Sequence, residues 1–333
     1  TYSLGALDWT LRGFVPFEWH LGKTVESGTI LQGEVPPIPV AVPGSVQMAL
    51  RKAGMLPDWR LGLNYRESEW VENRHWVYET HLPAGWSDER GTCFLRFDGL
   101  DQRGSILLNG RRIHEFENAH LPCRIDVTDD LSETDNVLTI VFECPPRWLG
   151  QFGRTSEMRE WKPRYNYGWD WTARLVQIGV TDDIVLEVVD DGEIVDISTS
   201  ASIDVAAGTA DLSIRGEVHA PDACVLEISL RDPSGDIVAG ATAAVAQFND
   251  TGITLEGLDV ALWWPNGQGD HPLYDIEARL IDGQGTVDEK HRVTGFRSVA
   301  WRSAEGAPDA ADPWICVVND QPVFIRGINW TPI

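Results

Sequence analysis

The sequence has few basic residues and no long apolar run. Lys and Arg total 27 against 51 Asp and Glu in 333 residues, which gives a formal net charge of −24. A surface this acidic repels phosphate backbones, so we expect no nucleic-acid partner. We expect no membrane partner either, because the longest apolar stretches fall far short of the ~20 residues that span a bilayer.

Cysteine is also scarce, and its positions exclude the usual cysteine-based sites. The five cysteines form no CxxC pair and no Cys/His cluster at zinc spacing, so we predict neither a metal site nor a cofactor. Reduced, mostly buried thiols favour a cytoplasmic location. No signal peptide is visible at the start, although a secreted protein stays open if a leader was removed.

Tryptophan, in contrast, is abundant, with 15 residues against 10 Phe. Indole faces stack on the C–H faces of sugars, so chains rich in Trp are often carbohydrate-active. The alternative is that these rings fill the cores of β-sandwiches. The composition therefore indicates sugar binding only if some of the rings lie in a suitable site.

The stretch RYNYGWDW, residues 164–171, places four aromatic residues around Asp170. An ionised carboxylate that is buried without a partner is strongly destabilising. Asp170 therefore either faces a wet pocket beside an indole, or pairs with Arg164 or Arg174 in a structural turn. Only the first interpretation provides a site for a sugar.

The pattern along the chain is almost entirely that of β-strands. Residues 45–54 are the exception, because Ser45 can cap a helix that Gly54 ends. WVYETHL alternates with period 2, Asn109-Gly110 is typical of a hairpin turn, and further strands follow at 136–142 and 183–189.

A new series of strands begins after Asp190-Asp191-Gly192. CVLEISLRD and LYDIEARLID each place alternate apolar residues on one face, and about seven strands in some 100 residues are typical of an immunoglobulin-like sandwich. The last stretch, VFIRGIN, is expected to form a buried strand. Such a strand either pairs with the preceding sandwich or belongs to something larger.

Nine stretches occur in the order found in one enzyme family: LDWTL, VPGSVQMAL, WVENRHWVYET, LRFDGLDQRGSILLNG, RIDVTDDL, GWDW, LWWPNGQGDHPLY, VTGFRSV and VFIRGINWTP. By these stretches the chain resembles the amino-terminal region of glycoside hydrolase family 2. This family holds β-mannosidases, β-galactosidases, β-glucuronidases and exo-β-glucosaminidases. The spacing and GWDW are most similar to the β-mannosidase branch.

The resemblance implies an all-β chain with three parts. Residues 1–191 would form a jelly-roll, galactose-binding-like domain, and residues 192–300 an immunoglobulin-like β-sandwich. Residues 301–333 would be a linker and the first strand of a (β/α)₈ barrel that is otherwise absent. The two catalytic glutamates of the family lie on later barrel strands, so this chain is expected to be inactive alone.

The resemblance also implies the site residues. Trp169 would form an apolar wall for a terminal sugar and Asp170 would accept hydrogen bonds from its hydroxyls. Separately from the resemblance, Trp171 is expected to pack inward, because it shares strand parity with Trp169 and one ring must support the other. Asn73 matches in spacing a sugar-contacting Asn of β-galactosidases, although a turn residue before a strand is the simpler explanation. The family usually continues GWDWGPR, whereas this chain has GWDWTAR, which leaves the direction of Asp170 in doubt.

Two kinds of function therefore remain. The first is the non-catalytic part of a retaining exo-glycosidase that removes terminal β-D-mannosides, with an exo-β-glucosaminidase or a β-galactosidase as the alternative. Its partners would be carbohydrate and its own barrel domain. The second is a stand-alone carbohydrate-binding module, which would bind sugar without further sequence.

Overall fold

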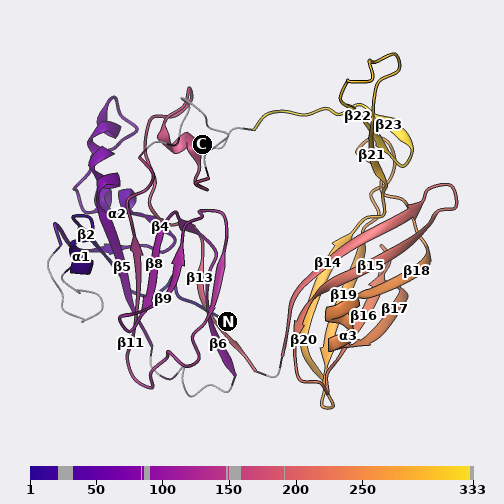
Figure 1. The fold of residues 1–333 in the computed structure, drawn as a ribbon, viewed down its shortest axis with the longest axis horizontal. Helices are drawn as coiled ribbons and strands as arrows, with labels where there is room; N and C mark the ends of the chain where they lie inside the picture. Colours follow the sequence, from indigo (N-terminus) through magenta and orange to yellow (C-terminus); the bar gives the residue numbers. More distant parts are fainter. Residues whose placement is uncertain are drawn as a thin grey trace. The chain divides into compact units, whose positions relative to one another are not determined.

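The computed structural model describes residues 1–21, 33–83, 85, 91–147, 149, 159–190 and 192–330. The chain separates into two compact units, Thr1–Asp190 and Asp191–Pro332, and each is built from antiparallel β-sheets (Figure 1). The predicted all-β class is confirmed.

Three sheets make up the described part of the first unit. Its largest has the order β3-β2-β5-β11-β8-β9: Val35–Val40, Trp9–Phe14, His75–Leu82, Asn136–Phe142, Gly104–Leu108 and Arg111–Phe116. A four-stranded sheet has the order β1-β13-β6-β10: Tyr2–Ser3, Ile184–Val189, Thr92–Phe97 and Cys123–Asp126. A small sheet has the order β4-β12-β7: Gly44–Ser45, Gly179–Val180 and Leu100–Asp101.

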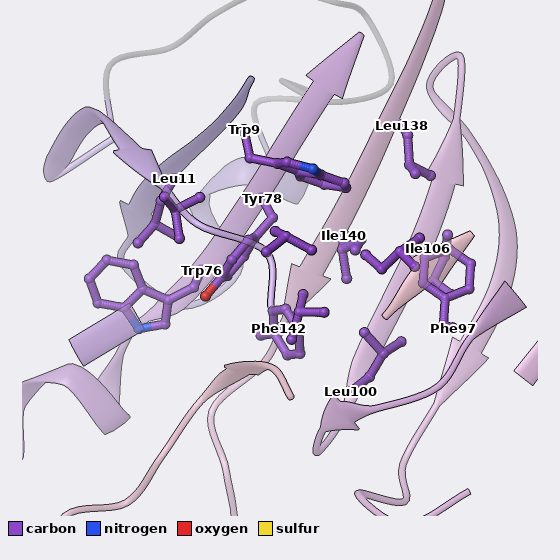
Figure 2. Close-up of a cluster of buried hydrophobic side chains, with 14 of the residues drawn as sticks. Trp9, Leu11, Trp76, Tyr78, Phe97, Leu100, Ile106, Leu138, Ile140 and Phe142 are labelled. Carbon is purple, nitrogen blue, oxygen red and sulfur yellow. The ribbon is translucent and has the colours of Figure 1, made fainter. Parts of the chain in front are cut away.

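The core of this first sandwich comes from the period-2 pattern of its strands. In β5 the side chains of Trp76, Tyr78 and Thr80 are buried, and across the ladder Trp76 faces Phe142 of β11. Figure 2 shows these rings packed with Trp9 and other apolar side chains of neighbouring strands. Burial of such large aromatic side chains supplies much of the driving force for the fold.

The opposite face of the six-stranded sheet is also covered. Trp19, on the short helix α1 (Glu18–Leu21), lies in a cluster with Val77 and Val141. Its indole N–H donates a hydrogen bond to His75 Nδ1 at 2.9 Å, and His75 is buried. Burial lowers the pKa of His75 to about 4, so this imidazole is neutral at physiological pH.

Local signals in the sequence placed several elements correctly. Helix α2 runs from Val46 to Lys52, and Ser45 Oγ accepts a hydrogen bond from Met48 N at 3.3 Å as an N-cap. Asn109 and Gly110 both have positive φ between β8 and β9, as a type I′ hairpin turn requires. The described residues of this unit also form the 3₁₀ helices η1 (Asn64–Asn73) and η4 (Arg164–Tyr167).

The second unit contains a sandwich of a three-stranded and a four-stranded sheet. The first has the order β14-β15-β18: Glu193–Asp204, Thr209–His219 and Ile253–Asp259. The second has the order β17-β16-β19-β20: Ile237–Ala244, Val225–Arg231, Tyr274–Ile281 and Thr286–Thr294. The alternate apolar residues predicted for β16 and β19 are buried, and helix α3 (Val245–Thr251), which was not predicted, places Phe248 in the same core.

A third small sheet lies at the end of this unit, with the order β21-β22-β23: Val299–Arg302, Ile315–Val318 and Gln321–Val323. Asn319 connects this sheet to the sandwich through its side chain. Its Nδ2 donates to the Trp263 carbonyl at 3.0 Å, and its Oδ1 accepts from Ser298 N at 2.9 Å. Asn319 is almost fully buried.

The buried strand expected at VFIRGIN is not formed. Val323 ends β23, and residues 324–330 have no strand partners, with Trp330 82% exposed. A strand requires a neighbouring strand for its backbone hydrogen bonds, and the described chain offers none here. The five cysteines are all free thiols, as predicted, and the cytoplasmic location inferred from them stays a prediction.

Candidate functional site

Residues 163–175, here called the aromatic loop, begin at a buried ion pair. The Lys162 ammonium donates hydrogen bonds to the Asp101 carboxylate and, at 2.6 Å, to the Gln177 carbonyl. The Lys162 side chain is 0% exposed and that of Asp101 is 3% exposed. Burial raises the pKa of Asp101 and lowers that of Lys162, because each charged form loses hydration.

The other end of the aromatic loop is fixed to helix α2. The Gln47 side-chain amide donates to the Val176 carbonyl at 2.6 Å, and its oxygen accepts from Ile178 N at 3.4 Å. Gln47 is buried, so these bonds are shielded from water. The loop is therefore anchored by a buried side chain at each of its ends.

Backbone hydrogen bonds close the loop on itself. Leu175 N donates to the Asn166 carbonyl at 2.9 Å, and Trp169 N donates to the Thr172 carbonyl at 3.0 Å. Gly168 enters this turn with φ of +99°, a conformation that favours glycine. Residues 169–172 are therefore the tip of the loop.

The tip is aromatic and open to solvent. Trp169 is 50% exposed and Trp171 is 42% exposed, and their rings meet in a T-shaped arrangement with centroids 5.9 Å apart. The Tyr165 ring lies 6.3 Å from that of Trp171. The expectation that Trp171 packs inward is wrong, because it assumed strand alternation where residues 170–172 form a bend.

Asp170 lies between the two tryptophans in the sequence, and its side chain is exposed. Within the described part of the chain it has neither a hydrogen bond nor an ion pair through its side chain. The alternative in which Arg174 pairs with Asp170 is not what the structure contains, because Arg174 binds Glu72. The Asp170 carboxylate is thus available to a ligand.

Asn73, the third predicted site residue, ends η1 and is also exposed. Its side-chain amide donates to the Glu69 carbonyl at 3.1 Å, which leaves its side-chain oxygen free to accept. The neighbouring Glu72 accepts two hydrogen bonds from Arg174, at 2.5 and 2.7 Å. The Glu72–Arg174 ion pair therefore joins η1 to the aromatic loop. Glu72 directly precedes Asn73, and Arg174 follows Asp170 by four residues.

A small cavity lies where the aromatic loop meets η1. Its lining consists of Ser68, Glu69, Glu72, Arg174, Leu175 and Val176. Its volume of about 10 Å³ is room for about one water molecule and not for a sugar ring. Burial raises the pKa of Glu72 in spite of the adjacent Arg174 guanidinium. This cavity is a packing feature of the loop, and a sugar would have to bind on the exposed side.

Sequence reasoning did not find the residues that hold the loop. Glu72 and Arg174 are 102 residues apart, and Lys162 and Asp101 are 61 apart, so no local spacing relates them. One available signal was the position of Glu72 directly before Asn73. A second was Arg174, which was considered only as a partner for Asp170.

The other tryptophan-rich stretch, LWWPNGQG, has a structural role. The Trp264 ring lies directly on Gly269, where an added Cβ would come within 2.8 Å of it. The Trp263 ring contacts Gly295 in the same way, and the Arg297 guanidinium lies 4.7 Å from its centroid. Both rings are partly buried by their own sandwich, so they offer no open platform for a sugar.

The described residues lack two other functional features. They contain no group of three or more His, Cys, Asp or Glu side chains placed to hold a metal ion. None of the helices that the structure describes is both long and apolar enough to cross a bilayer.

Comparison with known proteins gives two matches to parts of one family. Residues 19–182 match the description "Glycosyl hydrolase 2 galactose-binding domain-like", and residues 192–297 match "Glycosyl hydrolases family 2". Among curated proteins, Beta-mannosidase B of Aspergillus clavatus is 28% identical over 313 residues, which is 89% of this chain. The chain spans only 36% of that relative's length.

Solved structures show the same architecture. A β-D-mannosidase from Dictyoglomus thermophilum has a TM-score of 0.78 at 23% identity, with 99% of this chain and 40% of that chain covered. A β-glucuronidase from Ruminococcus gnavus in complex with D-glucuronic acid has a TM-score of 0.64 at 18% identity, with 98% and 48% covered. The two sandwiches are therefore a jelly-roll, galactose-binding-like domain and an immunoglobulin-like domain.

Proposed function

Because the chain belongs to glycoside hydrolase family 2, we propose that it is the sugar-positioning, non-catalytic part of a retaining exo-β-mannosidase. The relatives named Beta-mannosidase B support this choice of sugar. In this proposal the two catalytic glutamates lie in the part of the relatives that this chain does not span. The enzyme would remove terminal β-D-mannose residues from oligosaccharides.

The observation that carries the proposal is the exposed, unpaired carboxylate of Asp170 beside the Trp169 indole. A sugar ring has an apolar C–H face and a rim of hydroxyl groups, so an indole and a carboxylate together match both of its surfaces. Hydrogen bonds to an ionised acceptor are stronger than neutral ones. Asn73 would add a neutral acceptor from the neighbouring element.

In a retaining glycosidase one carboxylate attacks the anomeric carbon while a second carboxylic acid protonates the leaving oxygen, with the two about 5–5.5 Å apart. Neither role falls to Asp170 in this proposal. Asp170 would instead hold hydroxyl groups of the terminal sugar. Such contacts accelerate the reaction only to the extent that they strengthen in the transition state.

The experiment is a kinetic comparison in the full-length protein that contains this chain. Asp170→Ala should lower kcat/KM for an aryl β-mannoside about 100-fold, since it removes contacts worth a few kcal/mol in the transition state. Asp135→Ala is a matched control, because Asp135 is an exposed carboxylate elsewhere in the first unit. An effect below threefold at Asp170, with folding intact, would contradict the assigned role.

A stand-alone carbohydrate-binding module is the second candidate, and the two exposed indoles of Trp169 and Trp171, with the partly buried Tyr165 ring beside them, favour it. Calorimetry on the 333-residue chain distinguishes the two. A module should bind mannose or mannobiose without further sequence, whereas part of a pocket should bind neither measurably. The same kinetic assay with aryl β-glucosaminide and β-galactoside separates the alternative sugars.

A further inference from the structure

An ion pair joins the aromatic loop to η1. Arg174 Nη2 lies 2.5 Å from Glu72 Oε1 and 2.7 Å from Glu72 Oε2. Both side chains are largely withdrawn from water, with 24% of Arg174 and 14% of Glu72 exposed. The Arg174 guanidinium also lies over the Tyr167 ring, 5.1 Å from its centroid. The arginine therefore contacts both its own loop and the neighbouring element.

The Tyr167 ring that supports Arg174 is itself fixed. Its hydroxyl donates to the Pro146 carbonyl at 2.6 Å, and burial raises its pKa, so it stays protonated. Leu175 and Val176, which follow Arg174, line the same small cavity as Ser68 and Glu69 of η1. The returning half of the loop thus packs along η1, with the ion pair at the centre of the contact.

This pair differs from the exposed ion pairs on the same sandwich. Arg112 and Glu115, for example, are 57% and 67% exposed, and such pairs contribute little because water screens them. Removal of one partner from a shielded pair leaves a charge that must recover water, which requires the surrounding elements to separate. The shielded pair therefore determines geometry to a degree that an exposed pair does not.

We propose that Glu72 and Arg174 are positioning residues: their ion pair holds the aromatic loop against η1, so that Asp170 and Asn73 present their side chains to the same sugar. This inference rests on the proposed function and names the link that assembles its site. Neither residue is assigned a contact with the sugar.

The first test measures the link itself in the 333-residue chain. Arg174→Met keeps an unbranched apolar stem and removes the guanidinium with its charge. We expect amide hydrogen exchange of residues 168–173 to become roughly tenfold faster, as for a segment that has lost a tertiary tether. The matched control is Arg231→Met, because Arg231 pairs with Glu277 at 2.9 Å in the other sandwich. The control should leave exchange at 168–173 unchanged.

A charge-reversal variant keeps this test informative if Arg174→Met is poorly folded. Glu72→Arg combined with Arg174→Glu places the two charges in opposite order and allows the pair to form again. Exchange in the double variant should lie closer to wild type than in either single variant. Exchange that is equally slow in wild type, single and double variants would overturn the proposed link.

The second test measures the consequence in the full-length enzyme with an aryl β-mannoside. Arg174→Met should raise KM about tenfold and lower kcat/KM by more, since misplaced contacts weaken both substrate and transition state. Arg174→Lys keeps the charge and should recover part of the loss. A purely structural role would lower the yield of folded enzyme and leave the KM of the folded fraction unchanged.

The outcomes separate this inference from the proposed function. If exchange at 168–173 rises but KM and kcat/KM stay at wild-type values, the positioning role is wrong and the mannosidase assignment stands. If the wild-type full-length protein cleaves no aryl β-glycoside, the proposed function is wrong and the positioning role falls with it. A raised KM in Arg174→Met together with normal kinetics in Arg231→Met would support both.

Discussion

Trp169 and Trp171 on the aromatic loop are about half exposed, whereas in the second sandwich Trp264 lies on Gly269 of its own turn and Trp263 lies on Gly295 of a distant segment. Both pairs come from short, tryptophan-rich stretches with turn residues. In one pair the backbone closes below the rings and leaves them at a tip, and in the other the backbone folds directly onto the rings. Tryptophan content therefore does not separate exposed rings from packed ones, whereas the path of the adjacent backbone does.

The largest effect is expected when the buried Lys162–Asp101 ion pair at the base of the aromatic loop is broken. Lys162→Met should destabilise the first sandwich by about 3–5 kcal/mol, because it leaves the Asp101 charge buried without its partner. Native-state hydrogen exchange of β5 measures the free energy of unfolding of this unit separately. The double variant Lys162→Met/Asp101→Leu should recover most of the loss, and a single variant of wild-type stability would contradict the assigned importance of the pair.

The two sandwiches should also respond differently to acid. The pKa of His75 is lowered from 6.5 to about 4 in the folded state, so its contribution to stability is complete above pH 6.5. That contribution is lost as the pH falls from 6.5 to about 4, and a shift of this size corresponds to about 3 kcal/mol. Unfolding of the first unit in urea at pH 7, 5.5 and 4.5 measures the loss.

The pKa of His291, in the second sandwich, is shifted in the opposite direction. Hydrogen bonds to Glu289 and Asp275 raise its pKa, so its contribution is complete below pH 6.5 and is lost as the pH rises through the raised value. The His291 side chain is half exposed, so the effect is small.

The variant His75→Asn tests the acid response of the first sandwich. It keeps an acceptor for the Trp19 indole N–H and should reduce the dependence of the unfolding free energy on pH. An unaltered pH dependence would contradict the role of His75.

Overpacking against the Trp264 ring should destabilise the second sandwich by less than Lys162→Met destabilises the first. Gly269→Ala places a Cβ within 2.8 Å of the Trp264 ring, and the required shift should cost about 1–3 kcal/mol. Gly283→Ala is the control, because no atom lies within 4 Å of its added Cβ. Thermal unfolding of the two variants should show the difference, and equal melting temperatures would mean that the Trp264 ring is free to move.

The smallest expected effect is the most informative about the loop. Trp169→Ala should change the free energy of unfolding by less than about 0.5 kcal/mol, because the ring is at an exposed tip. Trp264→Ala, in contrast, should cost roughly 3 kcal/mol, since it leaves a gap over Gly269. Urea unfolding measures both, and a large loss at Trp169 would mean that its ring supports the fold.

Much of the fold was predictable because its signals are local. Alternation in β5, β16 and β19, the Asn109-Gly110 turn and the Ser45 cap each depend on residues a few positions apart. The order of nine family-like stretches then placed the two sandwiches. These predictions required no knowledge of which distant segments meet.

The rest of the fold and of the candidate site was not predictable, because it depends on contacts between segments that are far apart in the sequence. The Glu72–Arg174 and Lys162–Asp101 pairs join segments far apart in the chain, and a lone charged residue in a sequence gives no indication of its partner. Residues 324–330 have a strand-like sequence, but a strand forms only where another strand receives it. Trp171 was misplaced because its neighbours bend, which period-2 counting does not detect.

The contacts that secure the aromatic loop all lie below its tip, at Lys162, Gln47, Tyr167 and Arg174. Residues 169–172 can therefore be exchanged during evolution without loss of the scaffold that carries them. Under the proposed function, substitutions at this tip would change contacts with the sugar while the scaffold stays intact.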